Sequence, residues 1–389
     1  MLKKTFKFIL YFTLTVVVVI NLVILFSGRL YLYKGLWNTY FSGRSGPSAT
    51  EYLIFENRKV DAKNGKPLLN SKLYNTAKIP AEAEALLNKF GALAFVIVKN
   101  DSLFHEQYWD GFSDTSHTNS FSVSKTYCGI LLGCALKDGY VKSLDQPVSD
   151  FIPEFKEGDK AKITLRNLAT MTSGIDFNES YINPFAYPAE GYYGCDVLGA
   201  CLPYKVSEEP GKIFRYLSGN SALLGICISK ATGKTLSQYL SDRLWADLEC
   251  QQPAWWSLDK KDGQEKGFCC LNSNATDFVR IGMLYLNYGK WNGKQSVDSE
   301  YVANSIVPFN CKEDDGTPNK TYSYNWWLTE HKGDKIFYAR GILGQYVICV
   351  PSKKLVIVKL GRVRRPKTIS NHCPEDVAMC IDAATLMYP

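Results

Sequence analysis

The chain has 389 residues, of which 46% are apolar and 21% are charged, the composition of a folded globular protein rather than a disordered one. Its formal net charge of +7 comes from scattered lysines and arginines without a dense basic run, so nucleic-acid binding has little support. The length is sufficient for two closely packed subdomains, or for one large domain with an extension.

The first predicted element is an almost unbroken apolar run from Phe8 to Phe26. As a helix it is roughly 28 Å long, close to the ~30 Å hydrocarbon thickness of a bilayer. Three lysines precede the run, which favours an N-terminus on the cytoplasmic side. A cleaved signal peptide has a shorter apolar core and a small-residue cleavage site, and neither is evident. We therefore predict that residues 1–28 anchor the chain in a membrane, with a cleaved signal as the alternative. Either way, the rest of the chain is expected outside the cytoplasm, in the periplasm or at the cell surface.

Residues 29–80 are aromatic at first and then polar, and we predict a juxtamembrane connector and a small extension there. A helix is expected over Ala81–Lys89. Two strands, Ala92–Lys99 and Ser102–Trp109, follow and are joined by the turn Asn100-Asp101. The next helix-like run is Tyr127–Lys137, ending near Gly139.

From residue 143 to about 310 the pattern is helical with long loops, and then the period changes. The later segments Tyr322–Leu328, Lys335–Ala339, Tyr346–Val350 and Leu355–Leu360 are apolar and rich in β-forming residues, and an amphipathic helix over Pro374–Met387 closes the chain. Strands at both ends of a helical middle predict an α+β domain over 81–389. In it, one antiparallel sheet combines N- and C-terminal segments, is flanked by helices and carries an inserted helical lobe. A site between the sheet and the lobe is expected.

The twelve cysteines are too few for a disulfide scaffold, and no C-x-x-C pair indicates a zinc ribbon. Cys195 and Cys201 flank a short loop and are a candidate disulfide pair. The neighbours Cys269 and Cys270, together with Cys250, are further candidates, and spacing alone leaves the connectivity open.

The chemistry-bearing stretch is Phe121-Ser122-Val123-Ser124-Lys125-Thr126, where the helix-like run begins. Ser122 and Lys125 are three residues apart, so on a helix they lie one turn apart on the same face. A hydroxyl with an amine beside it at a helix start is a candidate activated nucleophile. Alone, Ser-x-x-Lys is a weak signal, because an ordinary solvated first turn contains the same residues.

Three further stretches strengthen this signal. They are Tyr216-Leu217-Ser218-Gly219-Asn220, Gly341-Ile342-Leu343-Gly344-Gln345 and the segment from Thr164 to Gly174. Together with Ser122-Val123-Ser124-Lys125, and in this order, they resemble the β-lactamase and penicillin-binding-protein superfamily of serine hydrolases. The resemblance extends from about residue 80 to the C-terminus.

The resemblance implies that Ser122 attacks a carbonyl and forms an acyl-enzyme, which water then hydrolyses. It implies that Tyr216 takes the hydroxyl proton, that Lys125 supports it electrostatically, and that the backbone N–H groups of Ser122 and Ile342 hold the oxyanion. No cofactor and no metal are implied.

Departures from the family pattern bear on which substrate the protein binds. Where β-lactamases and D,D-peptidases carry Lys-Thr-Gly or His-x-Gly, this chain has Ala339-Arg340-Gly341. We expect Arg340, Gly341 and Gln345 to contact substrate. Ser218 either orients Tyr216 or the substrate, or caps a helix.

The Gly-Ile-x-Gly-Gln and Tyr-x-Ser elements look more like the 6-aminohexanoate-dimer hydrolase and its related esterases and amidases, so a small linear amide, ester or peptide is the favoured substrate. Two alternatives stay open: a β-lactamase or D,D-carboxypeptidase acting on cell-wall peptides, and a penicillin-binding-like sensor without turnover.

Other signals are weaker. No G-x-S-x-G elbow is present, which argues against an α/β-hydrolase. His331-Lys332-Gly333 mimics His-x-Gly, but it precedes the expected strand and is predicted to be a hairpin turn. Trp326 and Trp327, and likewise Tyr192 and Tyr193, either frame the cleft or pack in the core.

Overall fold

A computed structural model describes residues 2–365, 368–369 and 373–389. Its centre is a six-stranded antiparallel sheet in the order β3-β2-β12-β11-β10-β9. The strands are β2 (Ala92–Lys99), β3 (Ser102–Tyr108), β9 (Trp327–His331), β10 (Asp334–Gly341), β11 (Gln345–Val350) and β12 (Leu355–Gly361). The predicted sheet of N- and C-terminal segments is confirmed, since β2 from the N-terminal part pairs with β12 from the C-terminal part.

The two predicted hairpins are also confirmed. Asn100 and Asp101 have φ values of 49° and 59° between β2 and β3, and Lys332 and Gly333 have values of 51° and 84° between β9 and β10. Left-handed residues in a two-residue loop match the twist of the strands that they join. The segment Tyr322–Leu328, predicted as a strand, is irregular up to Trp326, and β9 begins at Trp327.

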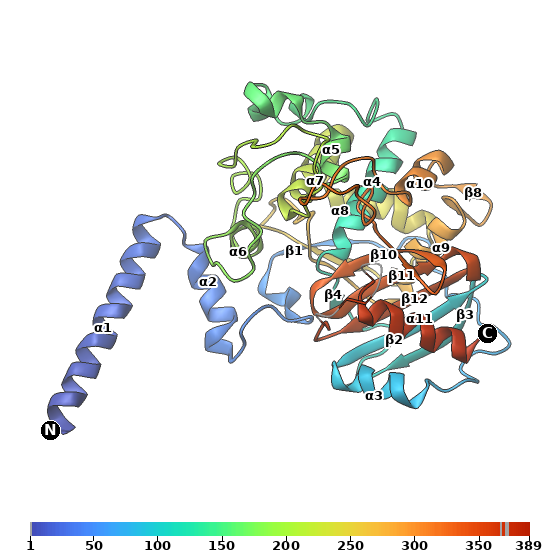
Figure 1. The fold of residues 1–389 in the computed structure, drawn as a ribbon, viewed down its shortest axis with the longest axis horizontal. Helices are drawn as coiled ribbons and strands as arrows, with labels where there is room; N and C mark the ends of the chain where they lie inside the picture. The colour runs from blue at the N-terminus through green and yellow to red at the C-terminus, as the bar shows by residue number, and fades with distance from the viewer. Residues whose placement is uncertain (1, 366–367, 370–372) are drawn as a thin grey trace.

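Helices cover both faces of the sheet. The helices α3 (Ala81–Lys89) and α11 (Glu375–Met387) share one core with one face of the sheet, whereas α4 (Val123–Lys137) and α9 (Ala275–Leu286) pack into the larger core on the other face (Figure 1). Helix α4 is buried from Val123 to Ala135, which explains its apolar residues on all sides. Because α4 is the innermost helix, the residues at its start are fixed relative to the sheet.

The region between β3 and β9 contains the predicted helical lobe. Its further helices are α5 (Leu165–Ala169), α6 (Tyr187–Tyr193), α7 (Ser218–Thr232), α8 (Leu236–Tyr239), which continues as a π-helix over Leu240–Trp245, and α10 (Ser299–Ser305). A second sheet has the order β1-β5-β6-β4, with β1 (Asn57–Val60), β4 (Thr118–Asn119), β5 (Ala254–Ser257) and β6 (Leu271–Ser273), and a short hairpin joins β7 (Lys290–Trp291) to β8 (Lys294–Gln295).

The N-terminal segment begins with α1 (Leu2–Phe26), which projects from the body of the molecule (Figure 1). Within it, Lys3–Phe26 is long and apolar enough to cross a membrane, with side chains that are mostly exposed, as in a signal sequence or an anchor. The following helix α2 (Tyr31–Asn38) packs against α6, and β1 pairs with β5. Parts of the predicted connector and extension over 29–80 therefore pack against the rest of the fold.

Candidate active site

The turn that carries Ser122 is held in an unusual backbone conformation. Ser122 immediately precedes α4, and Phe121 before it has a φ of 46°. A non-glycine residue persists in this left-handed region only when its surroundings fix it. The Phe121 ring is buried, and its centroid lies 6.5 Å from that of the Tyr192 ring. The backbone N–H of Phe121 donates to Asn119 Oδ1 at 2.8 Å. Packing and hydrogen bonding thus determine where the Ser122 hydroxyl points.

Hydrogen bonds extend from this turn into the N-terminal segment. Asn119 Nδ2 donates to the Tyr192 hydroxyl at 3.3 Å, and that hydroxyl donates to Glu51 Oε1 at 2.7 Å. Glu51 also forms an ion pair of 3.0 Å with Arg44. Burial raises the pKa of Glu51, which the bond from Tyr192 and the charge of Arg44 partly offset. Residues that precede the predicted hydrolase domain therefore support the nucleophile turn.

Lys125 lies where the Ser-x-x-Lys spacing predicts, and only 1% of the residue is exposed. Its Nζ donates to Ser122 Oγ at 2.8 Å and to the Phe268 carbonyl at 2.9 Å. The same Nζ lies 5.1 Å from the centroid of the Tyr216 ring. The structure thus brings the amine into contact with the hydroxyl of the same helical turn and next to the ring of Tyr216, which comes from a distant part of the chain.

Tyr216 belongs to an aromatic cluster at the edge of the sheet. Its ring centroid lies 4.8 Å from that of Trp327 and 5.8 Å from that of Tyr322. Burial raises the pKa of Tyr322 well above its ordinary value, so Tyr322 stays protonated. Tyr216 is only partly buried and is the member of the pair that adjoins Lys125.

Arg340 lies at the end of β10, with its guanidinium carbon 3.9 Å from the Trp327 ring centroid. Among the described residues no carboxylate is within ion-pair distance of Arg340, and its side chain lines the same cavity as Tyr216. A cation at this position is free to meet an anionic group of a ligand. Trp327 also lines that cavity, whereas Trp326 is fully buried in the core.

Ser218 is the first residue of α7, and its surroundings contain a group that the sequence motifs do not include. Its N–H donates to Glu179 Oε2 at 2.8 Å, and its hydroxyl donates to Glu179 Oε1 at 2.5 Å. The Tyr181 hydroxyl donates to the same carboxylate at 3.1 Å. Glu179 lies in the irregular segment that precedes α6, where no motif or periodicity singles it out. Only the fold brings this carboxylate to the site.

Gly341 makes the close contact between β10 and the nucleophile turn. A Cβ at this position would lie 2.3 Å from the Ser120 carbonyl oxygen, so only glycine fits. This contact holds the backbone of Ile342 near Ser122, and both residues line one cavity. Gln345 lies elsewhere: it is fully buried, and its Nε2 donates to the Gly361 carbonyl at 2.6 Å. The expected substrate contact of Gln345 is corrected to a role in holding β11 and β12.

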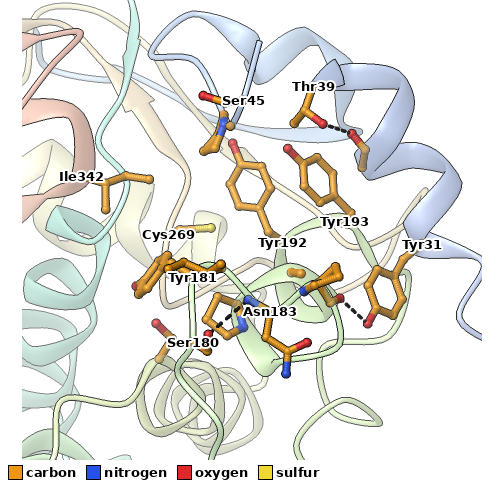
Figure 2. Close-up of a pocket in the computed structure, with 18 of the residues that line it drawn as sticks. Tyr31, Thr39, Ser45, Ser180, Tyr181, Asn183, Tyr192, Tyr193, Cys269 and Ile342 are labelled. Atoms are coloured by element: carbon orange, nitrogen blue, oxygen red, sulfur yellow. Dashed lines mark hydrogen bonds between the residues drawn. The ribbon is translucent and has the colours of Figure 1, made fainter. Parts of the chain in front are cut away.

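Two cavities flank the candidate catalytic groups. The first, of about 220 Å³, is lined by Ser122, Ser218, Ile342, Tyr192, Tyr193 and part of the N-terminal segment. Figure 2 shows Ile342 on one side of it and Tyr31 of α2 on the other. The second cavity, of about 950 Å³, contains Tyr216 and Arg340. The candidate catalytic groups therefore lie between an apolar cavity and a charged one.

Of the candidate cysteine pairs, one forms a disulfide and one does not. A disulfide joins the neighbours Cys269 and Cys270, whereas Cys195 and Cys201 are both free. Cys269 lines the smaller cavity and directly follows Phe268, whose carbonyl accepts a hydrogen bond from Lys125.

A second buried lysine lies nearby but does not reach Ser122. Lys266 is fully buried, its Nζ donates to the Tyr192 carbonyl, and it lies 3.9 Å from the Phe55 ring centroid. Burial lowers the pKa of Lys266 well below its ordinary value. Among the described residues no group of three or more histidine, cysteine or acidic side chains is arranged to hold a metal ion.

An antiparallel sheet with a buried helix that begins at Ser-x-x-Lys, next to a tyrosine from the helical lobe, is the arrangement of a serine hydrolase of the β-lactamase type. The family model "Beta-lactamase" matches residues 81–368, and the chain belongs to this family. It is a β-lactamase-family serine hydrolase, a class whose members act on amide and ester bonds.

Individual relatives agree with this membership. The chain is 26% identical to a 6-aminohexanoate-dimer hydrolase of Paenarthrobacter ureafaciens over 323 residues, which cover 75% of this chain and 79% of that protein. Its fold resembles a candidate 6-aminohexanoate-dimer hydrolase from Bacillus anthracis, with a TM-score of 0.70, 23% identity and coverage of 87% and 91% of the two chains. A family VIII carboxylesterase matches with a TM-score of 0.59, 15% identity and coverage of 82% and 98%.

Proposed function

We propose that this protein hydrolyses a small linear amide or ester through an acyl-enzyme on Ser122. The observation that carries the proposal is the contact of the buried Lys125 amine with the Ser122 hydroxyl at 2.8 Å, beside the Tyr216 ring. A serine hydroxyl is a poor nucleophile without such partners.

The proposed reaction has two halves. Tyr216 accepts the Ser122 proton as Oγ bonds to the substrate carbonyl carbon, and the N–H groups of Ser122 and Ile342 stabilise the oxyanion. The intermediate collapses with cleavage of the C–N or C–O bond, and the leaving amine or alcohol takes the proton. Water then attacks the acyl-enzyme, gives its proton to Tyr216, and releases the acid as Ser122 recovers its proton. Lys125 lies beside Tyr216 and supports its proposed role as base electrostatically.

We favour a linear substrate, because the strand that adjoins the site carries Ala339-Arg340-Gly341 in place of the β-lactamase pattern, and the P. ureafaciens relative is named a 6-aminohexanoate-dimer hydrolase. Arg340 and Ser218 are proposed to contact the substrate: Arg340 through an anionic group, and Ser218 through its hydroxyl at the wall of the smaller cavity. The apolar α1 supports a chain anchored in a membrane, with the hydrolase domain on the outer side.

A fluorophosphonate probe tests the nucleophile. The full chain in detergent should be labelled covalently, and Ser122→Ala should abolish both labelling and hydrolysis of a neutral acetate ester. Ser120→Ala is a matched control two residues away and should retain labelling. An unlabelled but folded wild-type protein would instead favour the sensor without turnover.

Reaction with labelled penicillin distinguishes the proposed amide or ester hydrolase from a β-lactamase or D,D-carboxypeptidase. Absence of reaction, together with hydrolysis of the 6-aminohexanoate linear dimer or of a simple ester, supports the proposal. Rapid acylation of Ser122 by penicillin would favour a β-lactamase or D,D-carboxypeptidase.

A further inference from the structure

The smaller cavity has a wall that the hydrolase domain does not supply. Leu32 and Leu36, one turn apart on α2, line it together with Pro188 and Ala189 of α6. Ser122 and Ile342 line the same cavity, so the reacting groups open directly into a largely apolar space. Its volume of about 220 Å³ is roughly seven times the ~30 Å³ share of one liquid water molecule. This is room for a short aliphatic chain.

Helix α2 is attached firmly enough to serve as a wall. Arg29 Nη1 donates to the Phe185 carbonyl at 2.9 Å, and the Tyr31 hydroxyl donates to the Pro184 carbonyl at 3.0 Å. The second of these bonds is drawn in Figure 2. A Cβ on Gly35 would lie 3.3 Å from the Tyr193 ring, so α2 and α6 are in close contact. The cavity is therefore a built feature of the fold.

The rim of this cavity is rich in exposed apolar side chains. Tyr40, Tyr181 and Ile182 line it and are 68%, 59% and 95% exposed, and Trp37 and Phe41 are exposed beside them. Helix α1 leaves the body next to this rim (Figure 1). Exposed tryptophan and tyrosine next to a helix able to span a bilayer are typical of the membrane–water interface. This face is thus suited to contact the membrane surface.

We propose that the cavity binds the aliphatic part of an ester or amide that resides in the bilayer and enters the site from the membrane. This inference rests on the proposed hydrolysis at Ser122 and on retention of α1. The scissile carbonyl lies at Ser122, the aliphatic part lies between α2 and α6, and the polar part extends toward Arg340 in the larger cavity. The substrate class is therefore an amphipathic lipid-like ester or amide, and α2 is part of its binding site.

The test measures chain-length preference with the full chain in phosphatidylcholine nanodiscs. The probes are 4-methylumbelliferyl acetate, butyrate and octanoate, and the readout is kcat/KM. Burial of one methylene gives at most about fourfold in affinity, so the octanoate should exceed the acetate by tenfold or more. Leu36→Asn and Ala189→Phe should each reduce the octanoate-to-acetate ratio at least fivefold, by making the wall polar and by filling the space. Leu386→Asn, the same change at an exposed leucine of α11 that lines neither cavity, is the control and should leave the ratio unchanged.

A second experiment tests whether the substrate enters from the membrane. A dodecanoyl ester placed in the vesicles that hold the enzyme should be hydrolysed at least tenfold faster than the same ester in separate, enzyme-free vesicles. Equal rates would overturn entry from the bilayer, and a chain-length ratio near one in the wild type would overturn the aliphatic site. Either result would leave the proposed function intact, provided that acetate is still hydrolysed and that this hydrolysis depends on Ser122. If the wild-type protein did not hydrolyse acetate, the proposed function itself would be refuted.

Discussion

Substitution of Lys125 by alanine is the most direct test of the site geometry. In the structure its buried Nζ makes two charge-assisted hydrogen bonds, at 2.8 Å to Ser122 Oγ and at 2.9 Å to the Phe268 carbonyl. These bonds hold the amine at the reacting hydroxyl, and only the stabilisation that increases in the transition state counts toward kcat. Loss of such a positioned acid–base partner usually lowers the rate by about 10²–10⁴-fold, which at 1.36 kcal/mol per factor of ten corresponds to about 3–5 kcal/mol.

The assay is hydrolysis of a neutral acetate ester by the full chain in detergent, with kcat and KM determined separately. The loss should fall on kcat rather than KM, because the amine stabilises the transition state and lies behind the hydroxyl. Lys137→Ala, at the exposed end of the same helix, controls for removal of a lysine from α4. If Lys125→Ala remained folded by circular dichroism and retained kcat within threefold of the wild type, the assigned role of the amine would be refuted.

Four further predictions follow from particular contacts. Tyr216→Phe should lower kcat by about 10²–10⁴-fold, and a wild-type rate would rule it out as the base. Gly341→Ala should lower kcat/KM by about 10²-fold, because its Cβ would lie 2.3 Å from the Ser120 carbonyl oxygen. An unchanged rate would show that the end of β10 does not help to form the oxyanion site. Arg340→Ala should lower kcat/KM by about tenfold or more for an amide with a terminal carboxylate and by less than twofold for a neutral ester, and equal effects would contradict a role in charge recognition. At pH values between the lowered pKa of Lys266 and the ordinary lysine value of 10.5, the Lys266 amine is neutral in the fold but protonated in the unfolded chain. Because the unfolded chain then binds more protons, the free energy of unfolding rises with pH. The thermal midpoint should therefore rise more steeply from about pH 7 to 10 in the wild type than in Lys266→Met, and identical slopes would show that Lys266 is not neutral in the fold.

The sequence predicted well the features that depend on local patterns. The hairpin at Asn100-Asp101 needs two residues that tolerate a left-handed backbone, and the sequence provides them. The Ser-x-x-Lys spacing leads to the contact between Ser122 and Lys125 because both residues lie in one turn. The sheet followed from the change of period near residue 320, since strands of period two replace helices there.

The features that escaped prediction depend on contacts between distant segments. Glu179 lies in a loop without periodicity, and only the packing of that loop against α7 brings its carboxylate to Ser218. Gln345 followed the family motif but is turned inward, because β11 lies inside the sheet and the carbonyl of Gly361 needs a donor. A π-helical turn over Leu240–Trp245 has no sequence signature that a helical pattern would reveal.

The N-terminal segment shows why the boundaries of a family match do not define the working unit. The match begins at residue 81, but β1 before it extends the second sheet, and Glu51 accepts the hydrogen bond of the buried Tyr192 hydroxyl. Without Glu51, the Tyr192 hydroxyl loses its acceptor. The chain of hydrogen bonds that leads from this hydroxyl through Asn119 to the left-handed Phe121 then loses its anchor. Buried polar groups left without partners cost about 1–3 kcal/mol each. The segment that precedes the family match thus helps to determine the position of the nucleophile, and the same segment closes the cavity into which that nucleophile opens.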